Sequence, residues 1–206
     1  MKLTLDNFSM NHVTPDSHLR VSLRPGEYYL AEKPTKVWTV LGSCLAIIFY
    51  NPRLQIGAIA HAQLAEQCID NGNCSQKCSD FCPGPCYQQI LDLNPYKYVS
   101  CAIRLMLEAF VQRGIFAHEI DVKLFGGASI LPLAHPVKSV GQLNIETAYK
   151  MLARYHLRLT EKHVGGTSGT TLYFYSDTGR VYWKPHRPLA LTSKNSGLTA
   201  PNMTNV

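Results

Sequence analysis

The stretch CLAIIFYNPRLQIGAIAHAQL, residues 44–64, decides the fold because it predicts two strands joined by a turn. The first part, CLAIIFY (44–50), is a continuous apolar run that begins with a cysteine, and QIGAIAHAQL (55–64) is a second apolar run. The residues NPRL (51–54) lie between them, and Asn-Pro marks a turn. The stretch therefore predicts an antiparallel β-hairpin.

The hairpin also predicts which side chains face each other. If Tyr50 pairs with Gln55 across the loop, Cys44 lies opposite His61. Directly opposed side chains share one face of a sheet, with Cβ atoms about 4.5–5.5 Å apart. A slip of one residue would place the two on opposite faces. The alternatives are a small buried cysteine and an ordinary polar histidine.

A thiol beside an imidazole has an evident chemistry. The imidazole accepts the thiol proton, and the resulting thiolate is a nucleophile for acyl transfer. The imidazolium then returns the proton to a leaving amine. The preceding Gly42-Ser43 step exposes backbone N–H groups that could stabilise an oxyanion. Cys44 and His61 are thus candidate catalytic residues.

Strand and helix patterns mix along the rest of the chain. Helical spacing of apolar residues predicts helices over 95–114, which starts with a proline, and over 144–156, with Asn144 as the cap. Asp177-Thr178-Gly179 predicts a hairpin between the last two strands. Hairpins with a few helices predict an α/β (α+β) layered sandwich with mixed, largely antiparallel sheets and flanking helices. The expected strands span 27–32, 37–41, 44–50, 55–64, 121–125, 157–164, 171–176 and 180–184.

Length and composition favour one domain with two tails. The 206 residues are 46% hydrophobic, and we expect an N-terminal arm over 1–24, a domain over 25–187 with an insertion at 66–90, and a disordered tail over 188–206. No secretory signal or membrane-spanning run is present, so we expect a cytoplasmic chain without membrane insertion. The net charge of +6 is spread out, which argues against nucleic acid and favours a solvated basic surface or an acidic protein partner.

Several stretches together resemble the CheD family of chemoreceptor glutamine deamidases. They are TVLGSCLAIIFYNPRLQIGAIAHAQL, KYVSCAIRLMLEAFVQRGI, DVKLFGGASIL, GQLNIETAYKML and HVGGTSGTTLYFYSDTGRVYWK, and the resemblance as a whole runs from residue 26 to residue 186. The resemblance implies conversion of receptor glutamine side chains to glutamate in bacterial chemotaxis. It implies Cys44 as the nucleophile, His61 as the base and Thr39 as a residue that orients the imidazole.

The resemblance also implies partners and a cleft. Methyl-accepting chemotaxis receptors would be the substrates, a CheC-like phosphatase would be a further partner, and catalysis would need no cofactor. The glycine-rich stretch VGGTSG (164–169) lacks the Lys-Ser/Thr ending of a phosphate-binding loop, so we interpret it and FGGAS (125–129) as tight turns. The resemblance implies that these turns line the reactive cleft. The candidate substrate-binding residues are Gly42, Ser43, Gly126, Gly127, Gly165, Gly166 and Thr167.

The insertion has no recognised counterpart in that family. It carries five cysteines in a polar stretch, and three interpretations stay open: a zinc or iron–sulfur site, disulfides, or unliganded thiols. The candidate metal ligands are Cys68, Cys74, Cys78, Cys82 and Cys86. A second hypothesis is therefore a non-catalytic chemotaxis binding module whose insertion senses metal or redox state. A third is a thiol hydrolase or protease of another substrate class.

Overall fold

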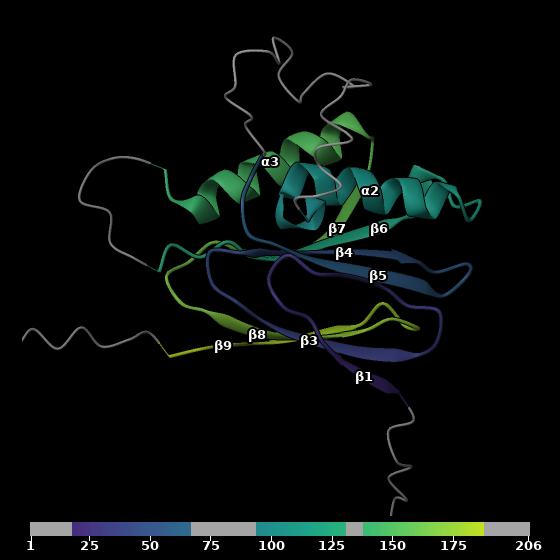
Figure 1. Ribbon diagram of the computed structural model, residues 1–206, viewed down its shortest axis with the longest axis horizontal. Coiled ribbons are helices and arrows are strands. Elements are labelled where there is room, and N and C mark those ends of the chain that lie inside the picture. Colours follow the sequence, from purple (N-terminus) through teal and green to yellow (C-terminus); the bar gives the residue numbers. More distant parts are fainter. Residues whose placement is uncertain (1–17, 67–93, 131–137, 188–206) are drawn as a thin grey trace, which may run out of the picture.

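The described residues form two β-sheets and a layer of helices (Figure 1). The computed structural model describes residues 18–66, 94–130 and 138–187. One sheet has four strands in the order β1-β3-β8-β9, and the other has five in the order β2-β5-β4-β6-β7. The strands are β1 (Leu19–Ser22), β2 (Tyr28–Leu30), β3 (Thr35–Leu41), β4 (Leu45–Asn51), β5 (Ile56–Ala62), β6 (Asp121–Gly126), β7 (Arg158–Val164), β8 (Thr170–Tyr175) and β9 (Val181–Pro185).

Both sheets are mixed but mainly antiparallel. Only the β1–β3 and β6–β7 pairs are parallel among the described strands. The remaining pairs, β2–β5, β3–β8, β4–β5, β4–β6 and β8–β9, are antiparallel. The predicted α+β layered sandwich is confirmed, and so is the late hairpin, which joins β8 to β9.

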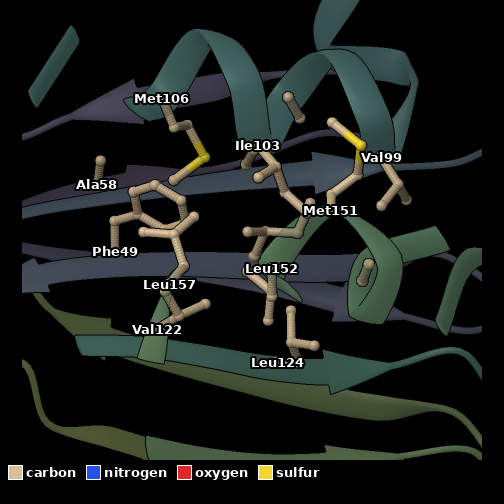
Figure 2. Close-up of a cluster of buried hydrophobic side chains, with 14 of the residues drawn as sticks. Phe49, Ala58, Val99, Ile103, Met106, Val122, Leu124, Met151, Leu152 and Leu157 are labelled. Atoms are coloured by element: carbon tan, nitrogen blue, oxygen red, sulfur yellow. The ribbon is translucent and has the colours of Figure 1, made fainter. Parts of the chain in front are cut away.

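Two helices cover the outer face of the five-stranded sheet. They are α2 (Val99–Val111) and α3 (Val140–Arg154), and two short 3₁₀ turns, η1 (Pro95–Lys97) and η2 (Ala117–Glu119), lie beside them in the chain. Figure 2 shows Ile103 and Met106 of α2 and Leu152 of α3 directed at the strands below them. Apolar side chains thus hold the helices on the sheet through a core that also contains Phe49, Ala58, Val99, Val122, Leu124, Met151 and Leu157.

A second core lies between the two sheets. Val37 of β3 and Phe174 of β8 meet Ile48 of β4 there. All seven residues of β4 are buried, because one face packs on the helices and the other on the four-stranded sheet. Burial on both faces explains the continuous apolar run of this strand. The strand β3 instead alternates, and its outward side chains Trp38 and Val40 face solvent.

The hairpin forms, but its predicted register is wrong by two residues. Asn51 pairs with Ile56, and His61 therefore lies opposite Ala46 rather than Cys44. The cause is Asn51, which is fully buried and belongs to β4: its Oδ1 accepts from the N–H of Leu54 at 2.8 Å, and its Nδ2 donates to the Glu119 carbonyl at 3.0 Å. A slip of two keeps each side chain on its face.

Two boundaries differ from expectation. Residues 19–22 of the expected N-terminal arm form β1, and Leu23 is buried, so this part belongs to the folded domain. The second helix starts at Val140, four residues earlier than predicted. Its cap is Ser139, whose Oγ accepts from the Gln142 N–H while the Gln142 side chain accepts from the Ser139 N–H. Asn144 is therefore not a cap but a buried residue inside α3.

No helix in the described part of the chain has the length and apolar character needed to cross a membrane.

Candidate active site

His61 lies in β5 at the end of the layer between the two sheets. Its side chain is 1% exposed. Its backbone is held on both sides by the turn before β2: the Gly26 N–H donates to the His61 carbonyl at 2.7 Å, and the His61 N–H donates to the Glu27 carbonyl at 2.9 Å. The imidazole is thus carried by a fixed segment of backbone.

A chain of hydrogen bonds sets the tautomer of this imidazole. Thr39 Oγ1 donates its only proton to the Leu23 carbonyl at 2.7 Å. Thr39 Oγ1 also lies 2.8 Å from His61 Nδ1, and without another proton it can only accept there. Nδ1 therefore carries the imidazole proton, and Nε2 of the neutral ring is a proton acceptor. Within the described residues, the buried Nε2 has no hydrogen-bond partner.

Cys44 immediately precedes β4 and is half-buried at the edge of the same layer. It packs against the inter-sheet core, whose β4 members Ala46 and Ile48 share its face, and Ala46 lies opposite His61. Cys44 and His61 are therefore on one side of the five-stranded sheet, although their atoms form no hydrogen bond in this resting geometry. Catalytic hydrogen bonds often form only in the complex with substrate.

Burial favours the neutral forms of both the Cys44 thiol and the His61 imidazole. It raises the pKa of the Cys44 thiol above its ordinary value, with a smaller opposing contribution from the residue's own backbone N–H. Burial also lowers the pKa of His61, against smaller raising effects of the Leu23 carbonyl and the Glu27 charge. Charged forms are disfavoured where water is excluded. At neutral pH the pair is therefore a neutral thiol and a neutral imidazole.

Three successive carbonyls fix the backbone around the cysteine. The Gly42 carbonyl accepts from the Ala128 N–H at 2.9 Å, and the Cys44 carbonyl accepts from the Gly127 N–H at 2.8 Å. Between them, the Ser43 carbonyl accepts from Asn144 Nδ2 at 2.9 Å. All three peptide planes are thereby set.

The sequence analysis assigned Asn144 to a helix cap and missed its role at the site. It is fully buried, and its Nδ2 donates a second hydrogen bond to the Gln63 carbonyl at 3.0 Å, two residues beyond His61. One side chain of α3 thus joins the cysteine loop to the end of the histidine strand. The signal was available: Asn144 lies on the helical stripe of Ala148 and Met151, where a polar residue needs a partner.

The Gly126-Gly127 turn packs directly on the cysteine loop. Gly126 has φ +100°, and a Cβ there would lie 2.4 Å from the Cys44 carbonyl oxygen. The second glycine pair is connected to this turn, since the Gly165 N–H donates to the Gly126 carbonyl at 2.8 Å and the Gly166 carbonyl accepts from Ser129. The structure therefore brings these four glycines to the site, whereas Thr167 is an exposed loop residue.

We expect Gly126→Ala to destabilise the protein by about 3 kcal/mol or more, because it adds a clash with the Cys44 backbone to the strain of a positive φ. Chemical denaturation measures this change. Gly165→Ala is the matched control: its φ is +87°, but nothing lies within 4 Å of the added Cβ. It should cost only the strain, about 1 kcal/mol. Equal losses in the two variants would contradict the close packing.

The five insertion cysteines lie outside the described residues. Among the residues that the structure does describe, no three His, Cys, Asp or Glu side chains come together as a metal site.

The site thus brings together a half-buried cysteine, a histidine with a set tautomer and a loop whose backbone carbonyls are hydrogen-bonded. A family model described as "CheD chemotactic sensory transduction" matches residues 85–185. That match begins after Cys44 and His61, but full-length relatives align over more of the chain.

Three relatives show the extent of the similarity. "Probable chemoreceptor glutamine deamidase CheD 2" of Geobacter sulfurreducens is 35% identical over 80% of this chain and 88% of its own length. "Probable chemoreceptor glutamine deamidase CheD" of Pseudomonas fluorescens is 33% identical over 88% of this chain and 93% of its own length. The protein of that name in Nitratidesulfovibrio vulgaris is 34% identical over 78% of this chain and 74% of its own length. The chain belongs to the CheD family, as the resemblance of its motifs predicted.

Proposed function

We propose that this protein is a chemoreceptor glutamine deamidase that acts in the cytoplasm in bacterial chemotaxis and converts receptor glutamine side chains to glutamate. The relatives carry that activity in their names. The observation that carries the proposal for this chain is the Thr39–His61 hydrogen bond, which leaves Nε2 as a proton acceptor on the face that Cys44 shares.

The reaction proceeds through a thioester on Cys44. The Cys44 thiol transfers its proton to His61 Nε2 as sulfur bonds to the side-chain carbonyl carbon of the glutamine. The imidazolium gives this proton to the amide nitrogen, the C–N bond breaks, and ammonia leaves. Water then loses a proton to Nε2 and attacks the thioester. The C–S bond breaks, the sulfur recovers the proton from the imidazolium, and the new carboxyl group loses its own proton to solvent, so that the receptor leaves with a glutamate side chain.

The neutral resting pair determines how the nucleophile forms. Because burial raises the pKa of Cys44 and lowers that of His61, a stable thiolate–imidazolium pair is disfavoured before substrate arrives. Proton transfer to Nε2 is therefore coupled to the attack of sulfur on the carbonyl carbon.

The backbone of the cysteine loop supplies the oxyanion donors. In a trans peptide the N–H points away from the carbonyl of the same plane. The Gly42 and Ser43 carbonyls are bound by Ala128 and Asn144, so the N–H groups of Ser43 and Cys44 point in the opposite direction. Neither N–H is paired with a carbonyl in the turns and loops of the described residues. Removing one such donor costs about 10²–10³ in kcat in known enzymes.

We expect Asn144→Ala to lower kcat about 10²-fold with little change in KM, because the Ser43–Cys44 peptide loses the bond that orients it. Alanine is the better helix former, so α3 itself should persist. Steady-state kinetics with a receptor fragment measures the effect. Lys150→Ala, an exposed change on the same helix, is the control. Unchanged kcat in Asn144→Ala would contradict this positioning role.

The direct test of the proposed function uses the purified chain and the cytoplasmic fragment of a chemoreceptor from the same organism. Ammonia should be released in proportion to glutamines that mass spectrometry identifies as glutamate, with the fragment otherwise intact. A cleaved fragment would favour the thiol protease instead. Neither ammonia nor cleavage, together with stable binding to the fragment or to a CheC-like phosphatase, would favour the non-catalytic module.

We also propose that the cysteines of the insertion bind zinc or an iron–sulfur cluster. Catalysis through Cys44 and His61 needs no cofactor, so we expect a zinc or iron–sulfur site to regulate or stabilise rather than react. Elemental analysis of the purified chain, with thiol titration, should find bound metal and few reactive insertion thiols. Metal-free protein whose insertion thiols all titrate would contradict a metal site, and metal-free protein with unreactive thiols would indicate disulfides.

A further inference from the structure

We propose that four aliphatic side chains around the cysteine loop (residues 42–44) form a rim that binds the receptor segment carrying the target glutamine. The rim consists of Leu64, Ile130, Val140 and Leu143. It would select segments with aliphatic rather than charged residues beside the glutamine. This role of the rim rests on the proposed function, because the receptor is the protein that would bring a glutamine to Cys44.

All four rim residues keep a large part of their side chains in solvent. The exposed fractions are 36% for Leu64, 42% for Ile130, 44% for Val140 and 43% for Leu143. Single exposed aliphatic residues are common on soluble proteins. Several of them gathered around a reactive loop are instead typical of an interaction site.

Ile130 lies directly against the cysteine loop. A Cβ placed on Gly42 would be 2.7 Å from Ile130 Cδ1, so the isoleucine side chain fills the space beside this glycine. The backbone before Ile130 is fixed by two hydrogen bonds. The Ala128 N–H donates to the Gly42 carbonyl at 2.9 Å, and the Ser129 N–H donates to the Gly166 carbonyl at 2.8 Å. Ile130 is thus held at the loop while part of its side chain reaches solvent.

The first turns of α3 bring two further rim residues to the same end of the sheet. The strand β4 starts where the antiparallel β6 ends, and α3 begins close to this end (Figure 1). Gly141 packs tightly there, because a Cβ on it would lie 2.3 Å from the Gly127 carbonyl oxygen. Val140 and Leu143 are three residues apart, so they are neighbours on the helix surface beside this contact.

Asn144 connects Leu143 and Leu64 to the cysteine loop. Its Nδ2 donates to the Ser43 carbonyl at 2.9 Å and to the Gln63 carbonyl at 3.0 Å. Leu143 precedes this asparagine in α3, and Leu64 follows Gln63 at the end of the histidine strand. Both leucines are therefore carried by segments that are bonded to one another through the side chain that orients the loop.

A receptor segment is the occupant that this arrangement favours. Cys44 is half-buried and a glutamine side chain is short, so the backbone of the substrate must come close to the cysteine loop. Residues beside the glutamine then meet the rim. Burial of aliphatic groups against the rim is favourable, whereas a charged group would lose its water without gaining a partner. The charge of Lys138, just before the cap of α3, is already paired with Glu146 at 2.6 Å.

Leu143→Gln and Ile130→Gln test the rim and leave the reacting groups in place. Glutamine is a good helix former, so α3 should persist. We expect each variant to raise KM for a receptor fragment about tenfold with kcat nearly unchanged, because apolar burial on binding is lost. Alkylation of Cys44 by iodoacetamide needs no rim contact and should keep its rate. Leu54→Gln is the matched control, since Leu54 is 42% exposed in the turn at the other end of the hairpin.

The substrate side of the contact has its own test. Mass spectrometry identifies the glutamines that are modified, and an aliphatic residue beside one of them is replaced by glutamate in the fragment. We expect kcat/KM at that glutamine to fall about tenfold. Equal kcat/KM for the two fragments, or modified glutamines with only charged neighbours, would overturn the proposal.

Binding of the fragment to Cys44→Ala separates the rim from the deamidase activity. No turnover by the wild type, with binding that Leu143→Gln weakens, would keep the rim and reject the deamidase. Turnover with unchanged KM in both rim variants would keep the deamidase and overturn the rim. Neither turnover nor binding would overturn both.

Other occupants of the rim have distinct outcomes. Lower thermal stability of the rim variants with unchanged KM would show that these side chains pack within the chain itself. A dimer in sedimentation that Leu143→Gln dissociates would assign the rim to a second copy. Either result would overturn the proposal.

Discussion

Replacing Cys44 with alanine should abolish ammonia release from a receptor fragment, with a loss of at least about 10⁴-fold in kcat/KM. The thiol supplies the bond on which the thioester depends, and no other cysteine takes its place on the shared face of β4 and β5 among the described residues. Cys44 is half-buried at the edge of the core, so removal of its sulfur should leave the fold and the thermal unfolding nearly unchanged.

Cys101→Ala is the matched control for this loss. Cys101 is the other described cysteine, and it is buried on α2. Its replacement should lower stability slightly and leave kcat/KM within a small factor of the original. Full activity in Cys44→Ala, or a comparable loss in Cys101→Ala, would remove the nucleophile from the mechanism.

Replacing His61 with alanine should lower kcat/KM by about 10²–10⁴-fold, the usual contribution of a general acid–base residue. The loss has two parts, because the imidazole both accepts the thiol proton and returns it to the leaving nitrogen. Thr39→Val keeps the shape of residue 39 but removes the acceptor of the Nδ1 proton. It should cost less than His61→Ala, since the imidazole remains but its tautomer is no longer set.

The pH dependence of kcat/KM provides a second readout of His61. Burial lowers the pKa of this imidazole, so the proton acceptor is lost only when the pH falls below the ordinary histidine value of about 6.5. Wild-type activity should therefore persist at pH 6.5 and decline at lower pH. An acid limb that is unchanged in His61→Ala would assign it to another group.

The sequence predicted those strands and turns that a local pattern of apolar and turn residues is sufficient to define. The apolar run of β4 and the Asn-Pro turn were sufficient for the hairpin, and the same pattern placed Cys44 and His61 on a common face. The register was missed because Asn51 looks like a turn residue, whereas its buried side chain ties the end of β4 to the Glu119 carbonyl. That contact joins residues 68 positions apart, which no local pattern reveals.

Two further features depended on tertiary structure. Asn144 resembled a helix cap because asparagine commonly starts helices, but Ser139 provides the cap and Asn144 binds two carbonyls of distant segments. The sequence also did not reveal which side chains form the outer face of the four-stranded sheet. Trp38 and Val40 are apolar residues that a sequence pattern would place in the core, and only the alternation of burial along the strand shows that they point to solvent.

Detection of the acyl-enzyme tests the central claim most directly. Wild-type enzyme is mixed with excess receptor fragment and quenched in acid, and the covalent product is digested and mapped by mass spectrometry. Our account predicts a thioester between Cys44 and a receptor glutamine position, absent from Cys44→Ala. An adduct on any other residue, or active turnover in which Cys44 is never acylated, would contradict it.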